Sequence, residues 1–179
     1  NDGGLAMSYD RGKTWDVLEN LPISQFYTVT ADEAVPYRIF GGLQDNGSVG
    51  FPSVGSSRSG LSERDVFRVG GGDGFFVATD PEDSSVVYSE SQFGGMSRQN
   101  LRTGERRSIQ PKAQKGEQPL RFNWNTPLHL SPNEKGTLYM RSQFLFRTRD
   151  QAQSWAHISP DLRTNDPHKQ RQEETGGDI

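Results

Sequence analysis

The sequence predicts an all-β protein made of short strands and tight turns, and two features of its composition indicate this. Of 179 residues, 20 are glycine and 10 are proline, so a turn-forming residue interrupts nearly every stretch long enough for a helix. The 10 Phe, 5 Tyr and 3 Trp residues supply side chains for a core, which argues against disorder. No stretch approaches the roughly 20 consecutive apolar residues of a transmembrane helix.

Charge and composition exclude several classes of function. The 20 Lys and Arg residues against 23 Asp and Glu residues leave a net charge of −3, which provides no basic field for nucleic acid or an anionic membrane. The absence of cysteine excludes disulfides and thiolate metal sites. His129, His157 and His168 lack the spacing of metal ligands. We therefore expect no nucleic-acid partner, no membrane insertion and no metal site.

Internal repeats decide the architecture. The segment 77–93 recurs 51 residues later as 128–144, with Pro81 matching Pro132 and Phe93 matching Phe144. The segment 29–47 resembles 77–95 at an offset of 48 residues, and the segment 8–15 resembles 148–155 at an offset of 140, close to three such periods. A period of about 40–50 residues with four strands is typical of a β-propeller blade.

Each repeat divides into four strands, which are rich in β-branched and aromatic residues and are separated by turn signals. First strands are expected at 26–32, 75–80 and 126–131, second strands at 37–44, 86–91 and 137–143, third strands at 48–51, 96–101 and 145–148, and fourth strands at 65–69, 106–109 and 155–159. Segments 4–9 and 15–18 supply two more strands. The polar, locally basic segment 102–118 is either a solvated loop or an anion-binding patch.

The chain thus corresponds to about three and a half four-stranded blades of a β-propeller. Residues 1–20 form the last two strands of one blade, and 21–70, 71–119 and 120–160 form three further blades. Residues 161–179 form a tail or a crossover to a missing blade. The remaining blades of a longer propeller are expected partners.

An eight-residue motif, Ser/Thr-x-Asp-x-Gly-x-Thr/Ser-Trp, is the most specific feature of the chain. Ser8 and Asp10 can accept hydrogen bonds from turn amides, Gly12 permits a positive φ, and Trp15 begins the next strand. We expect a structural hairpin turn, with the Trp15 ring buried between neighbouring blades. The second copy keeps Thr148, Asp150 and Trp155 but has Ala152 in place of the glycine.

The motif resembles the Asp-box, or bacterial neuraminidase repeat, of sialidases, xyloglucanase-type glycoside hydrolases and the sortilin ectodomain propeller. Segments 42–47, 70–75, 121–127 and 158–162 resemble large bacterial exported proteins of the sortilin-like repeat type, and the similarity covers essentially the whole chain. The resemblance implies a β-propeller with Asp-box turns and a secreted or periplasmic location.

Candidate ligand-binding residues lie in turns and at strand junctions, where a propeller presents its channel mouth. They are Gln44, Asp45, Asn46, Asp73, Gln92, Asn123, Trp124 and Asn125. Several have two interpretations. The segment 70–74 is an anion-binding nest or an inter-blade turn, and Trp124 stacks on a sugar ring or packs between blades. Asp45 and Asn46 form a plain turn or contact Ca²⁺; otherwise no cofactor is expected.

Glycoside hydrolysis needs two carboxylates, and Asp45 and Asp73 are the best pair, with Glu90 third. Xyloglucanase-type propellers place an essential Asp just before a Gly-Gly pair. The corresponding stretch here carries Gln92, which cannot act as a general base. The sequence therefore favours a non-catalytic propeller that binds a peptide or a glycan. The alternative is a fragment of a glycoside hydrolase that uses Asp45 and Asp73.

Overall fold

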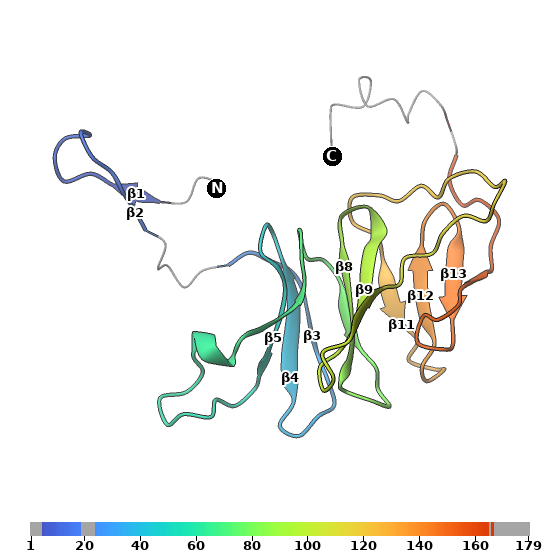
Figure 1. Ribbon diagram of the computed structural model, residues 1–179, viewed down its shortest axis with the longest axis horizontal. Helices are drawn as coiled ribbons and strands as arrows, with labels where there is room; N and C mark the ends of the chain where they lie inside the picture. The colour runs from blue at the N-terminus through green and yellow to red at the C-terminus, as the bar shows by residue number, and fades with distance from the viewer. Residues whose placement is uncertain (1–4, 19–23, 165, 167–179) are drawn as a thin grey trace.

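The computed structural model describes residues 5–18, 24–164 and 166, and it is all-β (Figure 1). Three four-stranded sheets lie side by side, and a two-stranded hairpin precedes them in the chain. Every strand pairs antiparallel with its neighbour in sequence. Each sheet is therefore a simple meander, the arrangement that short connecting turns favour.

The elements are as follows. The hairpin is β1 (Ala6–Met7) and β2 (Asp16–Val17). The first sheet is β3 (Phe26–Ala31), β4 (Arg38–Leu43), β5 (Gly47–Pro52) and β6 (Phe67–Gly70). The second sheet is β7 (Val77–Thr79), β8 (Val86–Ser91), β9 (Gly95–Asn100) and β10 (Arg106–Ser108). The third sheet is β11 (Leu128–Leu130), β12 (Leu138–Arg141), β13 (Leu145–Thr148) and β14 (Ala156–His157). Two short 3₁₀ helices, η1 (Glu63–Asp65) and η2 (Gln92–Gly94), lie in the connections.

The predicted strands are confirmed, with ends within two residues of those observed. A polar residue ends each first strand in the same way. Asp32 Oδ1 accepts a hydrogen bond from Arg38 N (2.7 Å), Asp80 Oδ1 from Glu82 N (2.9 Å) and Ser131 Oγ from Glu134 N (3.0 Å). Each of these side chains accepts a hydrogen bond from a turn amide that has no partner in the sheet.

The core lies between the sheets. Alternate residues of β8 face opposite ways, as a strand requires. Val86 and Tyr88 belong to a cluster with Leu138 and Met140 of the third sheet, whereas Val87 belongs to a cluster with Phe40 of the first sheet. The second sheet is thus covered on both faces, which explains why β8 is the most completely buried strand.

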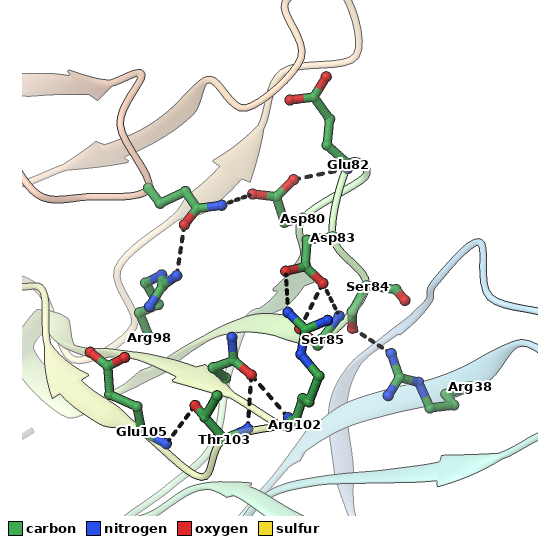
Figure 2. Close-up of polar contacts among 12 residues, drawn as sticks. Arg38, Asp80, Glu82, Asp83, Ser84, Ser85, Arg98, Arg102, Thr103 and Glu105 are labelled. Atoms are coloured by element: carbon green, nitrogen blue, oxygen red, sulfur yellow. Dashed lines mark hydrogen bonds and ion pairs between the residues drawn. The ribbon is translucent and has the colours of Figure 1, made fainter.

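Polar contacts also join the sheets at the end opposite the β8–β9 turn (Figure 2). The Arg38 guanidinium on β4 binds Asp32 (2.6 Å) and donates to the carbonyl of Ser84 in the second sheet. Gln151 of the third sheet donates to Asp80 Oδ2 (2.9 Å) and accepts from Arg98 (2.6 Å). These hydrogen bonds fix the spacing of neighbouring sheets at this end.

The prediction that Trp15 is buried is wrong: its side chain is 63% exposed. Leu5, Met7 and Val17 of the same hairpin are exposed as well. The physical reason is that a two-stranded hairpin has no second layer to cover its faces.

The chain after residue 160 is attached to the third sheet over its described part. Leu162 N donates to Gln143 O (2.8 Å), and Asp161 pairs with Arg121 (2.7 Å). Most of the expected tail or crossover, 161–179, lies outside the described residues. Within the described part of the chain, no helix has the length and apolar character needed to cross a membrane.

Candidate functional site

All eight predicted ligand-binding residues lie at one end of the sheets. The turns β4–β5 and β8–β9 are at this end, as are the segments that lead into β7 and β11, because antiparallel strands return to the same edge at every second turn. In Figure 1 it is the upper edge of the three sheets. We call it the upper edge below.

Asp45 and Asp73 are brought together, but not as a catalytic pair. Asp73 Oδ1 accepts a hydrogen bond from Asp45 N (2.5 Å), and Asp73 is only 6% exposed. Gly47 N donates to Gly72 O (2.8 Å), and Gly74 N donates to Leu43 O (2.9 Å). The segment 70–74 is therefore an inter-sheet turn, in which the Asp73 carboxylate holds the β4–β5 turn in place. It supports the positive φ of 59° at Asp45, whose side chain is exposed.

Gln92 lies in η2 and reaches the same glycine-rich turn. A Cβ on Gly72 would lie 2.2 Å from Gln92 Oε1, so the amide occupies the space that a side chain at position 72 would take. Gly72 also has a φ of +67°. The positive φ favours glycine at this position, and Gln92 packs beside it as a half-buried amide.

A row of aromatic rings crosses the upper edge. Tyr27 and Phe75 have ring centroids 4.8 Å apart, Phe75 and Trp124 6.4 Å, and Trp124 and Phe93 5.2 Å. Of the two interpretations of Trp124, the structure shows packing between neighbouring sheets. Within the row, Phe75 is buried, while Phe93 at its end is 50% exposed.

Sequence reasoning missed Phe93 as a site residue, because it used Phe93 only as a repeat match to Phe144. In the structure, Phe93 has a φ of 55°. A bulky residue with positive φ is uncommon and carries backbone strain. Phe93 N donates to Trp124 O (3.0 Å), which holds the residue in this conformation. No local sequence signal marks such a φ.

Amide side chains complete the edge. Asn46 is exposed, and its Nδ2 donates to Gln44 O (3.1 Å), while Gln44 N donates to Gln25 O (3.0 Å). Asn123 and Asn125 flank Trp124 and are exposed. The Asn123 carbonyl accepts from Thr126 Oγ1 (3.2 Å). The upper edge thus presents amides and rings to solvent.

Glu90 points inward, which settles the orientation that its sequence left open. The side chain is 1% exposed, its Oε1 accepts from Thr126 N (2.8 Å) and its Oε2 from Phe76 N (3.5 Å). Burial raises the pKa of Glu90 to about 8, although both hydrogen bonds act in the opposite direction. Glu90 therefore joins the second sheet to the segment before β11.

The metal interpretation of the Asp45–Asn46 turn gains no support. Across residues 5–18, 24–164 and 166, no group of three or more His, Cys, Asp or Glu side chains could hold a metal ion. The carboxylate of Asp73, the other acidic candidate near this turn, accepts a hydrogen bond from the backbone amide of Asp45.

Neither a protein-family model nor a curated protein sequence matches this chain.

Proposed function

We propose that the three four-stranded sheets are consecutive blades of a sortilin-like, Asp-box β-propeller, and that the upper edge is a non-catalytic binding surface for a peptide or a carbohydrate. The repeat of 48 to 51 residues, the meander order of each sheet and the Asp-box turns support the propeller. The remaining blades would belong to a longer exported protein, secreted or periplasmic, as the resemblance implies.

One observation carries the binding function: Asp73 and Glu90, two of the three candidate carboxylates, face inward, while an aromatic ring and several amides of the upper edge are exposed. Asp73 and Glu90 both accept hydrogen bonds from backbone amides and are almost completely buried. Phe93, Asn46 and Asn125 are exposed. Hydrolysis of a glycosidic bond requires two carboxyl groups that flank the substrate. Of the three candidate carboxylates, only Asp45 is on the surface.

The test is a binding measurement on the full chain with two ligand panels, short peptides and neutral oligosaccharides. We expect one panel to contain a ligand whose affinity falls by about tenfold in Phe93→Ala, as expected for loss of an aromatic contact. Asn46→Ala should weaken the same ligand. Val54→Ala is the matched control, because Val54 is an exposed apolar residue after β5, at the opposite end of the sheet.

Two results would contradict this proposal. A ligand bound equally well by Phe93→Ala, Asn46→Ala and the unaltered chain would place binding elsewhere. Hydrolysis of β-glucan or xyloglucan that is lost in Asp45→Asn and in Asp73→Asn would favour the alternative, a glycoside hydrolase that uses these two residues.

A further inference from the structure

A second candidate site, which none of the eight predicted ligand-binding residues lines, lies between the third sheet and the segment that follows the second sheet. An open pocket of about 560 Å³ lies between the third sheet and the segment 109–120 that follows β10. This volume is within the range of small-molecule binding sites, about 300–1,000 Å³. We call it the Trp155 pocket, after the tryptophan of the second Asp-box turn, which lines it.

One wall of the Trp155 pocket is aromatic. His157 lies against Phe144, with ring centroids 4.1 Å apart, and 5.7 Å from the ring of Phe146. Trp155 Nε1 donates to Ile109 O (2.8 Å), across the gap between the sheets. This bond satisfies the only polar atom of the indole and fixes the ring, so Trp155 offers the pocket an apolar face.

The segment 109–120 lines the pocket with both apolar and polar side chains. It includes Gln110, Gln114 and Gln118, whose amide groups can each donate and accept hydrogen bonds. The segment that carries them is anchored, because Gln110 Nε2 donates to Phe93 O (2.9 Å) and Gln114 N donates to Glu117 Oε2 (2.9 Å). The wall is therefore positioned by the fold.

Charge in the Trp155 pocket is balanced. Among the lining residues, Lys112 is the only Lys or Arg and Glu117 the only Asp or Glu. An anionic ligand would find no excess of positive charge. The arginines of the basic segment 102–118 do not line this pocket.

We propose that the Trp155 pocket binds a sugar residue of a neutral oligosaccharide. A pyranose ring has C–H faces that suit aromatic surfaces and hydroxyl groups that both donate and accept, as amides do. The lining residues provide both chemistries without net charge. The inference does not depend on the upper edge, because none of the upper-edge candidate residues lines the cavity.

The test uses the full chain and neutral tetrasaccharides of glucose, xylose, mannose and N-acetylglucosamine, measured by isothermal titration calorimetry. We expect at least one to bind, and its affinity to fall by about tenfold in His157→Ala and in Gln118→Ala, because each removes one wall's contact. Trp15→Ala is the matched control, since Trp15 holds the equivalent position in the other Asp-box turn, and it should leave affinity unchanged.

A second readout reports on the pocket directly. In a Trp15→Phe, Trp124→Phe variant, Trp155 is the only tryptophan, and the bound tetrasaccharide should change its fluorescence with saturation. The inference is overturned if no tetrasaccharide binds at millimolar concentration. It is also overturned if binding survives His157→Ala and Gln118→Ala in folded protein. Loss of tetrasaccharide binding only in Phe93→Ala would assign the sugar to the upper edge and refute the pocket.

Discussion

The turns β1–β2 and β13–β14 carry the same eight-residue motif, with alanine in place of the glycine in the second, and the hydrogen bonds that their Asp side chains accept are the same. Asp10 Oδ1 accepts from Lys13 N and Thr14 N at 2.9 Å each, and Asp10 Oδ2 accepts from Thr14 Oγ1 at 2.8 Å. In the second turn, Asp150 Oδ1 accepts from Gln153 N (2.9 Å) and Ser154 N (3.0 Å), and Oδ2 accepts from Ser154 Oγ (2.6 Å). The motif therefore builds its turn from local contacts alone.

The backbone conformation is also shared, even where the glycine is missing. Arg11 and Gly12 have φ values of 64° and 84°, and Gln151 and Ala152 have 56° and 61°. An alanine thus adopts the left-handed conformation that the glycine adopts without strain. Ala152 N donates to Thr148 Oγ1 (3.0 Å), and the Asp150 side chain accepts from the residues that follow, so hydrogen bonds on both sides hold the alanine in this conformation.

The surroundings of the two turns differ. Gln151 binds Asp80 and Arg98 of the second sheet, Ala152 is buried in the core, and Trp155 donates to Ile109 O. Arg11 and Trp15 of the first turn are exposed. The comparison teaches that the motif determines a turn, whereas a neighbouring sheet determines whether the tryptophan becomes a core residue.

The two tryptophans give the sharpest test of this comparison. Trp155→Ala should lower the free energy of unfolding by about 3–5 kcal/mol, because a large ring is lost from between two sheets. Trp15→Ala should cost less than about 1 kcal/mol, as exposed positions do. Urea denaturation of both variants measures the difference. Equal costs would mean that Trp15 is packed in solution and would remove the contrast.

Asp150 of the second turn and the buried Glu90 should make stability depend on pH in opposite directions. Burial raises the pKa of Asp150, but hydrogen bonds from Ser154, Thr148 and Gln153 outweigh it and lower the pKa to about 2. The stability that Asp150 contributes is thus lost as the pH falls from about 4 to about 2. For Glu90 the sign is opposite. Its folded pKa of about 8 exceeds the usual 4.5, so the folded state holds a proton that the unfolded state releases.

Stability should therefore fall by about 3–5 kcal/mol through Glu90 as the pH rises from about 4.5 to about 8. Glu90→Gln should remove most of this fall in stability between pH 4.5 and 8. The loss of stability below pH 4, which comes from Asp150, should remain. Denaturation midpoints across pH 3–9 measure both limbs. An unchanged slope above pH 5 in Glu90→Gln would show that Glu90 is ionised in the folded protein.

The contacts of the second turn with the second sheet predict a smaller effect. Gln151→Ala removes hydrogen bonds to Asp80 and Arg98 and should cost about 1–2 kcal/mol. Arg11→Ala, at the same position of the first turn, should stay within about 0.5 kcal/mol of the unaltered chain. Thermal unfolding of the two variants and of the unaltered chain measures both effects. A cost at Arg11 that matches the cost at Gln151 would contradict the difference in surroundings.

The smallest effect concerns the glycine position. Ala152→Gly relieves a left-handed alanine, worth about 1 kcal/mol, but removes a buried methyl group worth about 0.8 kcal/mol, so the net change should be near zero. Gly12→Ala gains no such packing, because its Cβ would have only the Trp15 ring edge at 3.8 Å. It should weaken the hairpin by about 1 kcal/mol, which amide exchange of Lys13 and Thr14 would report. Clear destabilisation by Ala152→Gly would show that packing outweighs strain.

The strands and their turns could be predicted because they depend on neighbours in sequence. The period of 48 to 51 residues placed every strand, and Asp32, Asp80 and Ser131 marked the ends of the first strands. The candidate site was predicted only as a set of residues at one edge. That Asp73 accepts from Asp45 N, 28 positions away, depends on how one sheet lies against the next. The Trp155 pocket was missed because the segment 109–120 has no regular pattern that predicts a wall.

By itself, the sequence determined an all-β chain, its repeat, its strand order and the internal geometry of the two eight-residue turns, because hydrogen bonds within a few residues are set by local composition. Only the tertiary structure decided which carboxylates face inward, which tryptophan is covered and where a cavity remains. These properties depend on the face that each sheet presents to its neighbour, and residues far apart in sequence supply the two sides of every such contact.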